Sequence, residues 1–270
     1  MSFSKRIDEA RKAYRRKDLS ALELAHDIER IRHPEREPHG ASSSSYVGEM
    51  VYGGLDGIIT TFAVVSGVAG ARLSADVVII LGVANLLADG FSMATGSYLS
   101  ARSQRQLYEM EMKREAHEVE HFPEAEREEL VQAYKARGFT EEESQTLADI
   151  YTKSAKRWVE AMMVDELGMI PDIRNPLMIG LATFIAFNVA GFVPLLAYVV
   201  GLFVPLSMDT EFLWTTILSG IALFLLGGAR TLITGFSLWR SGLEMLFVGG
   251  IAGAVAFAVG RFLAKLGLGS

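Results

Sequence analysis

Nine of the 21 residues from Glu109 to Glu129 are glutamates. If this stretch is helical, Glu115 and Glu118 fall on one face, because residues three and four apart are neighbours on a helix. Glu126 forms a second such pair with Glu129. Carboxylate oxygens that converge in this way are the ligands that Ca²⁺, Mg²⁺ and Mn²⁺ prefer. A solvated charged face has the same spacing, so the pattern alone leaves both interpretations open.

A methionine and a glutamate four residues apart, Met162 and Glu166, follow later in the chain. A thioether added to carboxylates shifts the preference of a site toward a softer first-row metal such as Fe²⁺. Met162 is also the kind of residue that fills a hydrophobic core. His117 and His121 share a helix face and are a further candidate pair for metal binding.

The apolar stretch from Met50 to Gly70 contains a carboxylate, Asp56. A charge near the bilayer centre costs at least ~2.5–3.5 kcal/mol, so such a residue is usually functional. In two antiparallel helices that rise ~1.5 Å per residue, Asp56, Asp89 and Met93 lie at one depth. They could strip a divalent cation of part of its water, and a carboxylate that exchanges a proton for the metal would couple the two fluxes. Alternatively, Asp56 is protonated or hydrogen-bonded within the bundle.

The elements that must position these residues are membrane helices. Half of the residues are hydrophobic and the mean hydropathy is +0.25, which indicates a polytopic membrane protein. The predicted spans are residues 46–71, 76–101, 176–207, 212–233 and 242–262. Pro194 and Pro205 predict a kink or a ragged end in the third span. The spacing of Gly53 with Gly57, and of Ser92 with Gly96, allows close helix–helix approach.

A charged segment of residues 102–174 separates the second and third spans and is predicted to be helical. The second span should continue as a helix through His121, and Pro123 suits the first turn of the next helix. Thr140 and Glu143 have the spacing of a capping box. The predicted organisation is a basic N-terminal arm (1–45), spans one and two (46–101), a cytoplasmic helical metal-binding domain (102–174) and spans three to five (175–270). In the arm, Ser20 and Glu23 predict the cap of a short helix, followed by a linker.

Charge sets the predicted orientation and excludes some functions. Residues 1–46 hold 10 of the 26 Lys and Arg, and residues 101–174 hold 11. The positive-inside rule therefore places the N-terminus and the insert in the cytoplasm, and the C-terminus outside. A net charge of −6 gives no case for nucleic-acid binding, and the absence of cysteine excludes disulfides and thiolate metal sites. The absence of organelle-targeting signals and of glycosylation sequons favours a bacterial inner membrane.

Three motifs carry a resemblance to a known family. The stretches "DGIITTFAVVSGVAGA" and "ADGFSMATGSYLSARSQ" resemble the first two spans of the vacuolar iron transporter family, and "RSGLEMLFVGGIAGAVAFAVG" resembles its last span. The resemblance implies that Asp56 and Met93 are transit ligands. The metal ligands that it implies in the insert are Glu115, Glu118, Glu126, Glu129, Met162 and Glu166. Where plant and yeast members have a glutamate this chain has Asn85, and where they have a small residue it has Asp89, so a carboxylate has in effect moved by one turn.

The prediction is therefore an all-α, five-span homodimer in the bilayer that moves Fe²⁺, and also Mn²⁺, out of the cytoplasm in exchange for protons. The dimer and the exchange are implied by the resemblance. Such a protein is a secondary transporter rather than an enzyme and needs no prosthetic group. One alternative is a manganese-selective exporter. Another is a membrane-anchored iron-storage or ferroxidase protein, which expects two Glu-x-x-His motifs; Glu118 with His121 supplies one.

Overall fold

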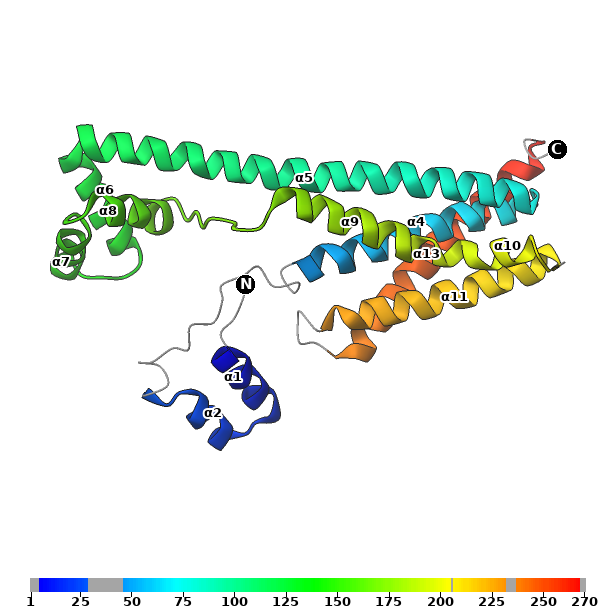
Figure 1. The fold of residues 1–270 in the computed structure, drawn as a ribbon, viewed down its shortest axis with the longest axis horizontal. Coiled ribbons are helices and arrows are strands. Elements are labelled where there is room, and N and C mark those ends of the chain that lie inside the picture. Colours follow the sequence, from blue (N-terminus) through cyan, green and yellow to red (C-terminus); the bar gives the residue numbers. More distant parts are fainter. Residues whose placement is uncertain (1–4, 29–45, 205, 232–236, 268–270) are drawn as a thin grey trace. The chain divides into compact units, whose positions relative to one another are not determined.

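A computed structural model describes residues 5–28, 46–204, 206–231 and 237–267, and within these ranges it contains helices and no strand (Figure 1). The helices, in chain order, are α1 (Lys5–Arg16), α2 (Leu19–Ala25), α4 (Val47–Gly70), α5 (Ala75–His121), α6 (Pro123–Ala136), α7 (Glu141–Tyr151), α8 (Ala155–Ala161), the π-helical turn η2 (Met162–Glu166), α9 (Pro176–Gly191), the 3₁₀ turn η3 (Val193–Leu195), α10 (Leu196–Gly201), α11 (Met208–Ala229) and α13 (Leu238–Lys265).

The chain divides into two compact units. One comprises the described residues up to Thr95 together with those from Leu177 onward, and the other comprises Gly96–Pro176. Helix α5 contributes to both, because it continues from Ala75 to His121 without interruption. The first unit holds the membrane spans and the second is the charged insert.

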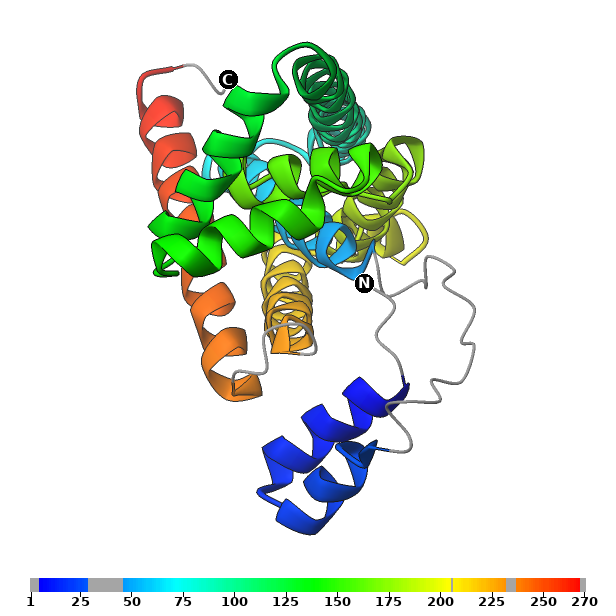
Figure 2. The same ribbon diagram turned by 90° about the vertical axis from the view of Figure 1, so that its left-hand side faces the viewer.

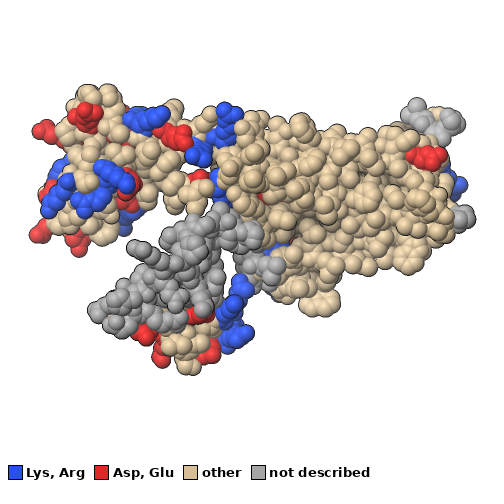
Figure 3. Space-filling view, in the orientation of Figure 1, with Lys and Arg blue, Asp and Glu red and all other residues tan. Residues whose placement is uncertain are grey.

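Among the described residues, five segments are long and apolar enough to cross a bilayer, and the predicted all-α, five-span membrane protein is confirmed. They are α4, the first part of α5, the α9–α10 segment, α11 and α13. On the face drawn in Figure 3, the surface of the spans shows a broad area almost without charged side chains, whereas Lys, Arg, Asp and Glu crowd the surface of the insert. Lipid is the solvent that such an uncharged surface requires.

The third span is interrupted, as its prolines predict. Helix α9 ends at Gly191, and Pro194 lies in the 3₁₀ turn before α10. Proline lacks the backbone N–H that a continuous helix needs, which explains the break. The Thr215 hydroxyl in α11 donates a hydrogen bond of 2.9 Å to the Pro194 carbonyl in this buried region. Pro205 lies outside the described residues.

Helix α4 packs against its neighbours by backbone contact. A Cβ on Gly57 would lie 2.3 Å from the Phe187 carbonyl oxygen of α9, and one on Gly70 would lie 2.2 Å from that of Phe257 in α13. Gly53 likewise faces the backbone of α9. The predicted close approach through Gly53 and Gly57 is confirmed, with α9 as the partner. A Cβ on Gly96, by contrast, would meet nothing within 4 Å.

The N-terminal arm differs from the prediction. Two helices form there, α1 and α2, and Asp18 rather than Ser20 caps α2. The Asp18 carboxylate accepts a hydrogen bond of 3.0 Å from the backbone N–H of Ala21 and one of 2.9 Å from the Ser20 hydroxyl. Asp18 occupies the N-cap position, from which a side-chain oxygen can accept a hydrogen bond from the first turn, whereas Ser20 already lies inside that turn.

The insert folds around a small apolar core. Pro123 begins α6, Gly138 takes the left-handed conformation (φ +97°) after α6 ends, and Thr140 and Glu143 form the predicted capping box of α7. Helices α6, α7 and α8, green in Figure 2, pack as a short bundle. The core residues are Val119, Leu130, Val131, Tyr134, Ala148, Trp158, Val159, Ala161, Met162 and Met163.

The last helix of the insert, α8, changes to a π-helical turn at Met162. The backbone N–H of Leu167 donates to the Met162 carbonyl at 3.1 Å, five residues back. Met162 is fully buried whereas Glu166 is exposed. Short π-helical segments are frequent at functional sites.

We expect Gly57→Ala to destabilise the bundle. The added methyl group would meet the Phe187 carbonyl at 2.3 Å, and the helices must separate to accept it. Such overpacking costs roughly 1–3 kcal/mol. Thermal unfolding in detergent measures the loss. Gly96→Ala is the matched control and should not lower the midpoint, because nothing lies near that position. Equal midpoints for the two variants would contradict the close packing of α4 on α9.

Candidate metal sites

The end of α5 and the start of α6 bring three carboxylates together. One oxygen from each of Glu115, Glu118 and Glu126 lies within 4.8 Å of the others. Glu115 and Glu118 share a face of α5, and Pro123 starts α6 directly after α5 ends. Ligands that bind one hard divalent cation at about 2.0–2.6 Å are at most about 5 Å apart, so this spacing suits a shared ion. We call these three residues the glutamate triad.

Two members of the triad are removed from water. Glu115 is 1% exposed and Glu126 is 4% exposed. The Oε2 atom of each is buried and makes no hydrogen bond with any protein group. A buried carboxylate oxygen without a partner is costly, because nothing replaces the water that it has lost. A cation bound between the two oxygens would remove that cost.

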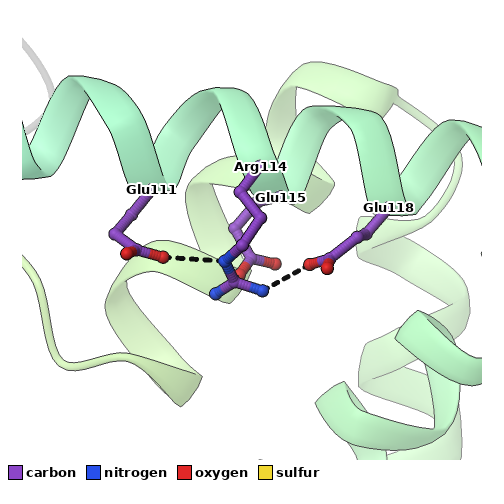
Figure 4. A network of polar contacts seen from close by, with 4 residues as sticks. All are labelled: Glu111, Arg114, Glu115 and Glu118. Carbon is purple, nitrogen blue, oxygen red and sulfur yellow. Dashed lines mark hydrogen bonds and ion pairs between the residues drawn. The ribbon is translucent and has the colours of Figure 1, made fainter.

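The guanidinium group of Arg114 contacts three carboxylates at once (Figure 4). Its Nε donates to Glu111 Oε2 at 2.8 Å, and its Nη2 donates to Glu115 Oε1 at 2.6 Å. Its Nη1 pairs with Glu118 Oε2. All four residues come from α5. The arginine therefore neutralises part of the charge of the triad.

Burial raises the pKa of Glu126 to about 7, and four neighbouring carboxylates that repel its negative form add to this shift. They are Glu115, Glu129, Glu118 and Glu166. Repulsion by Glu129 and Glu166 indicates that these two predicted ligands also lie near the triad. Both are exposed, and both line an open hollow between α6 and η2. Five of the six predicted ligands of the insert thus lie in one acidic region.

The sixth predicted ligand, Met162, packs within the apolar core of the insert. Glu166, four residues later, is exposed, so the two members of this predicted pair differ in burial. The two predicted histidines, His117 and His121, contact each other. Their ring centroids lie 4.0 Å apart, and His121 Nδ1 lies 2.8 Å from the carbonyl oxygen of His117.

Within the spans, two aspartates lie near enough for their charges to interact. Asp56 on α4 and Asp89 on α5 are both half-buried, and their carboxylates repel each other. The Asn85 side-chain amide, one turn from Asp89, donates to Asp89 Oδ2 at 2.7 Å. Met93 is partly buried against the apolar cluster that includes Phe187. The charges of Asp56 and Asp89 therefore interact, and Met93 lies one turn beyond Asp89 on the same helix.

Two charged residues, Arg114 and Glu211, were not predicted from the sequence to have a role. Arg114 lies three residues after Glu111 and four before Glu118, which is the spacing that predicts ion pairs on a helix. Its contact with the adjacent Glu115 does not follow from that spacing. Glu211 is 4% exposed in the first turn of α11. It lies directly before the predicted span of residues 212–233, so its burial was not expected from the sequence.

Comparison with known proteins shows the family of this chain. The sequence model of the VIT family matches residues 47–261. The vacuolar iron transporter of Toxoplasma gondii is 38% identical over 266 residues, which cover 95% of this chain and 88% of that protein. The vacuolar iron transporter of Plasmodium falciparum is 35% identical, with 96% and 97% covered. Vacuolar iron transporter 1 of Arabidopsis thaliana is 33% identical, with 82% and 87% covered. A match over most of the chain, together with five spans, shows that this protein belongs to the VIT family.

Proposed function

We propose that the protein moves Fe²⁺, with Mn²⁺ as a second cargo, out of the cytoplasm in exchange for protons. The observation that carries the proposal is the pair of buried, unpartnered carboxylate oxygens on Glu115 and Glu126, supported by the two intramembrane aspartates. The relatives named as iron transporters supply the identity of the metal.

The insert acts as the capture site in this proposal. The glutamate triad offers hard oxygen ligands, and Glu129 and Glu166 add negative charge at the neighbouring open hollow. Such a surface attracts divalent cations from solution and concentrates them. Met162 stays a predicted ligand of this site, and its side chain is fully buried in the apolar core of the insert.

Asp56, Asp89 and Met93 act as the ligands of transit. Two carboxylates that repel each other favour binding of either a cation or a proton, and exchange of one for the other couples the fluxes. Asp89 and Asn85 are only half-buried within one chain. Polar groups on that face are too costly to leave against hydrocarbon, so we propose that a second copy of the chain or a water-lined path covers them.

The orientation follows from the basic residues, with the N-terminus and the insert on the cytoplasmic side and the C-terminus outside. The functional division is then a basic arm (1–45), spans one and two (46–101), a metal-capturing domain (102–174) and spans three to five (175–270). A bacterial inner membrane stays a prediction from the sequence.

We expect Asp56→Asn to slow Fe²⁺ entry into proteoliposomes with an acidic interior by about tenfold or more, the effect of losing roughly 1.4 kcal/mol of stabilisation in transit. The amide keeps the shape of the side chain but can neither carry a negative charge nor exchange a proton. A metal-quenched dye inside the vesicle reports the flux, and a pH dye reports proton counterflow.

Asp76→Asn is the matched control, because Asp76 is an exposed residue in the first turn of α5, away from Met93 along the helix. Its flux should equal that of the unmodified protein. Equal flux in Asp56→Asn would remove Asp56 from the pathway, and metal entry without proton counterflow would remove the exchange.

We expect the metal-free insert to lose stability as pH rises. The pKa of Glu126 is about 7 in the folded state and 4.5 without the fold, so its contribution is fully present below pH 4.5 and is lost as pH rises through 7. The loss amounts to roughly 3 kcal/mol. Hydrogen exchange of α6 in the full-length protein measures it. Added Mn²⁺ should restore protection more at pH 8 than at pH 5.5, and Glu126→Gln should flatten the pH dependence. Protection that rises with pH without metal would contradict the assignment.

A further inference from the structure

We propose that Arg114 is a built-in counter-cation of the capture site, which an incoming divalent metal must displace. The guanidinium group already holds two members of the glutamate triad, through Nη2 to Glu115 and Nη1 to Glu118 (Figure 4). The inference rests on the proposed function, since it concerns how the same site takes up its metal.

The contacts of Arg114 overlap with those that a metal requires. Glu115 gives one oxygen to the guanidinium and leaves its other oxygen buried and unpartnered. Glu118 gives Oε2 to the same group. A divalent ion within reach of these carboxylates lies only a few ångströms from the positive guanidinium, and two like charges at that separation repel strongly where water is scarce. Metal and arginine therefore compete for the same negative charge.

Arg114 is also the member of the network that can leave. Its side chain is 44% exposed, whereas that of Glu115 is 1% exposed and fixed within the insert. Glu111, which lies one turn earlier on α5 and outside the triad, binds the Nε atom at 2.8 Å. After displacement, Glu111 can keep the guanidinium on the helix surface while the triad holds the metal. The arginine thus remains paired in both states.

This arrangement has a functional value for a carrier. Without metal, the arginine prevents the buried carboxylates from repelling one another and keeps their geometry near that of the bound state. With metal, its return competes with the ion and speeds release. A transporter needs binding that is reversible, so a site weakened by its own cation suits capture and delivery better than storage.

Mn²⁺ binding to the full-length protein in detergent, followed by calorimetric titration, tests the proposal. We expect Arg114→Gln to bind Mn²⁺ roughly tenfold more tightly at the insert site, within the usual range for coupling between two binding events. Hydrogen exchange at the end of α5 should be faster than in the unmodified protein without metal and equal to it with metal. Arg114→Lys keeps the charge without the three-way fork, so its affinity should lie between those of the unmodified protein and Arg114→Gln.

Arg105→Gln is the matched control. Arg105 lies earlier on the same helix and makes one exposed ion pair, with Glu109 at 3.0 Å, so its loss should leave Mn²⁺ affinity unchanged. Glu126→Gln identifies the insert site as the binding component that it weakens. If Glu126→Gln leaves the titration unaltered, the proposed capture site fails, whatever the arginine does. If Glu126→Gln weakens binding but Arg114→Gln binds Mn²⁺ equally or more weakly, or Arg114→Lys binds more tightly than Arg114→Gln, the counter-cation role is overturned.

Discussion

A carboxylate taken out of water must be neutralised by a proton, a cation or a close set of hydrogen bonds. Both candidate sites of this protein are organised by that constraint. In the insert, Glu115 and Glu126 are almost fully buried, and Arg114 neutralises part of their charge. In the spans, Asp56 and Asp89 lie close enough to repel each other, and Asn85 supplies one hydrogen bond to Asp89. Each site is thus incompletely neutralised by the protein alone, which is the electrostatic condition for binding a cation.

Helix α5 links the two sites in sequence. It carries Asp89 and Met93 in its membrane part and Glu115 and Glu118 near its end. Its length is sustained by helix-forming residues with no glycine or proline between Gly96 and His121. Pro123 then starts α6 and brings Glu126 to the same place as the last turns of α5. Local helix signals therefore assemble the triad, without a long-range contact having to select it.

Features that follow from local chemistry could be predicted from the sequence. Hydropathy predicted the five spans, and Pro123 predicted the end of α5 and the start of α6. The capping box predicted the start of α7. Features that depend on which side chains meet could not. The π-helical turn at Met162, the capping of α2 by Asp18 and the three-way contact of Arg114 all arise from such choices.

The same distinction applies to the sites. The spacing of Glu115 and Glu118 predicted a shared face, but their burial depends on the apolar core that forms beneath them. Spacing alone cannot tell a methionine that fills the core from one that binds a metal. The structure shows that Met162 is fully buried in the core of the insert. The interaction between the charges of Asp56 and Asp89 agrees with their predicted common depth in the membrane. That depth depends on the length and direction of two antiparallel helices rather than on packing.

The glycines of α4 and those of α5 make different kinds of close contact with neighbouring helices. On α4, Gly57 and Gly70 lie against carbonyl oxygens of neighbouring helices, so any sliding there brings rigid main chain into collision. On α5, Gly82 and Gly90 lie instead against the side-chain ends of Leu195 and Asn188, which rotamer changes can accommodate. Relative sliding of the helices is therefore opposed more strongly along α4, by rigid main chain, than along α5, where side chains can adjust.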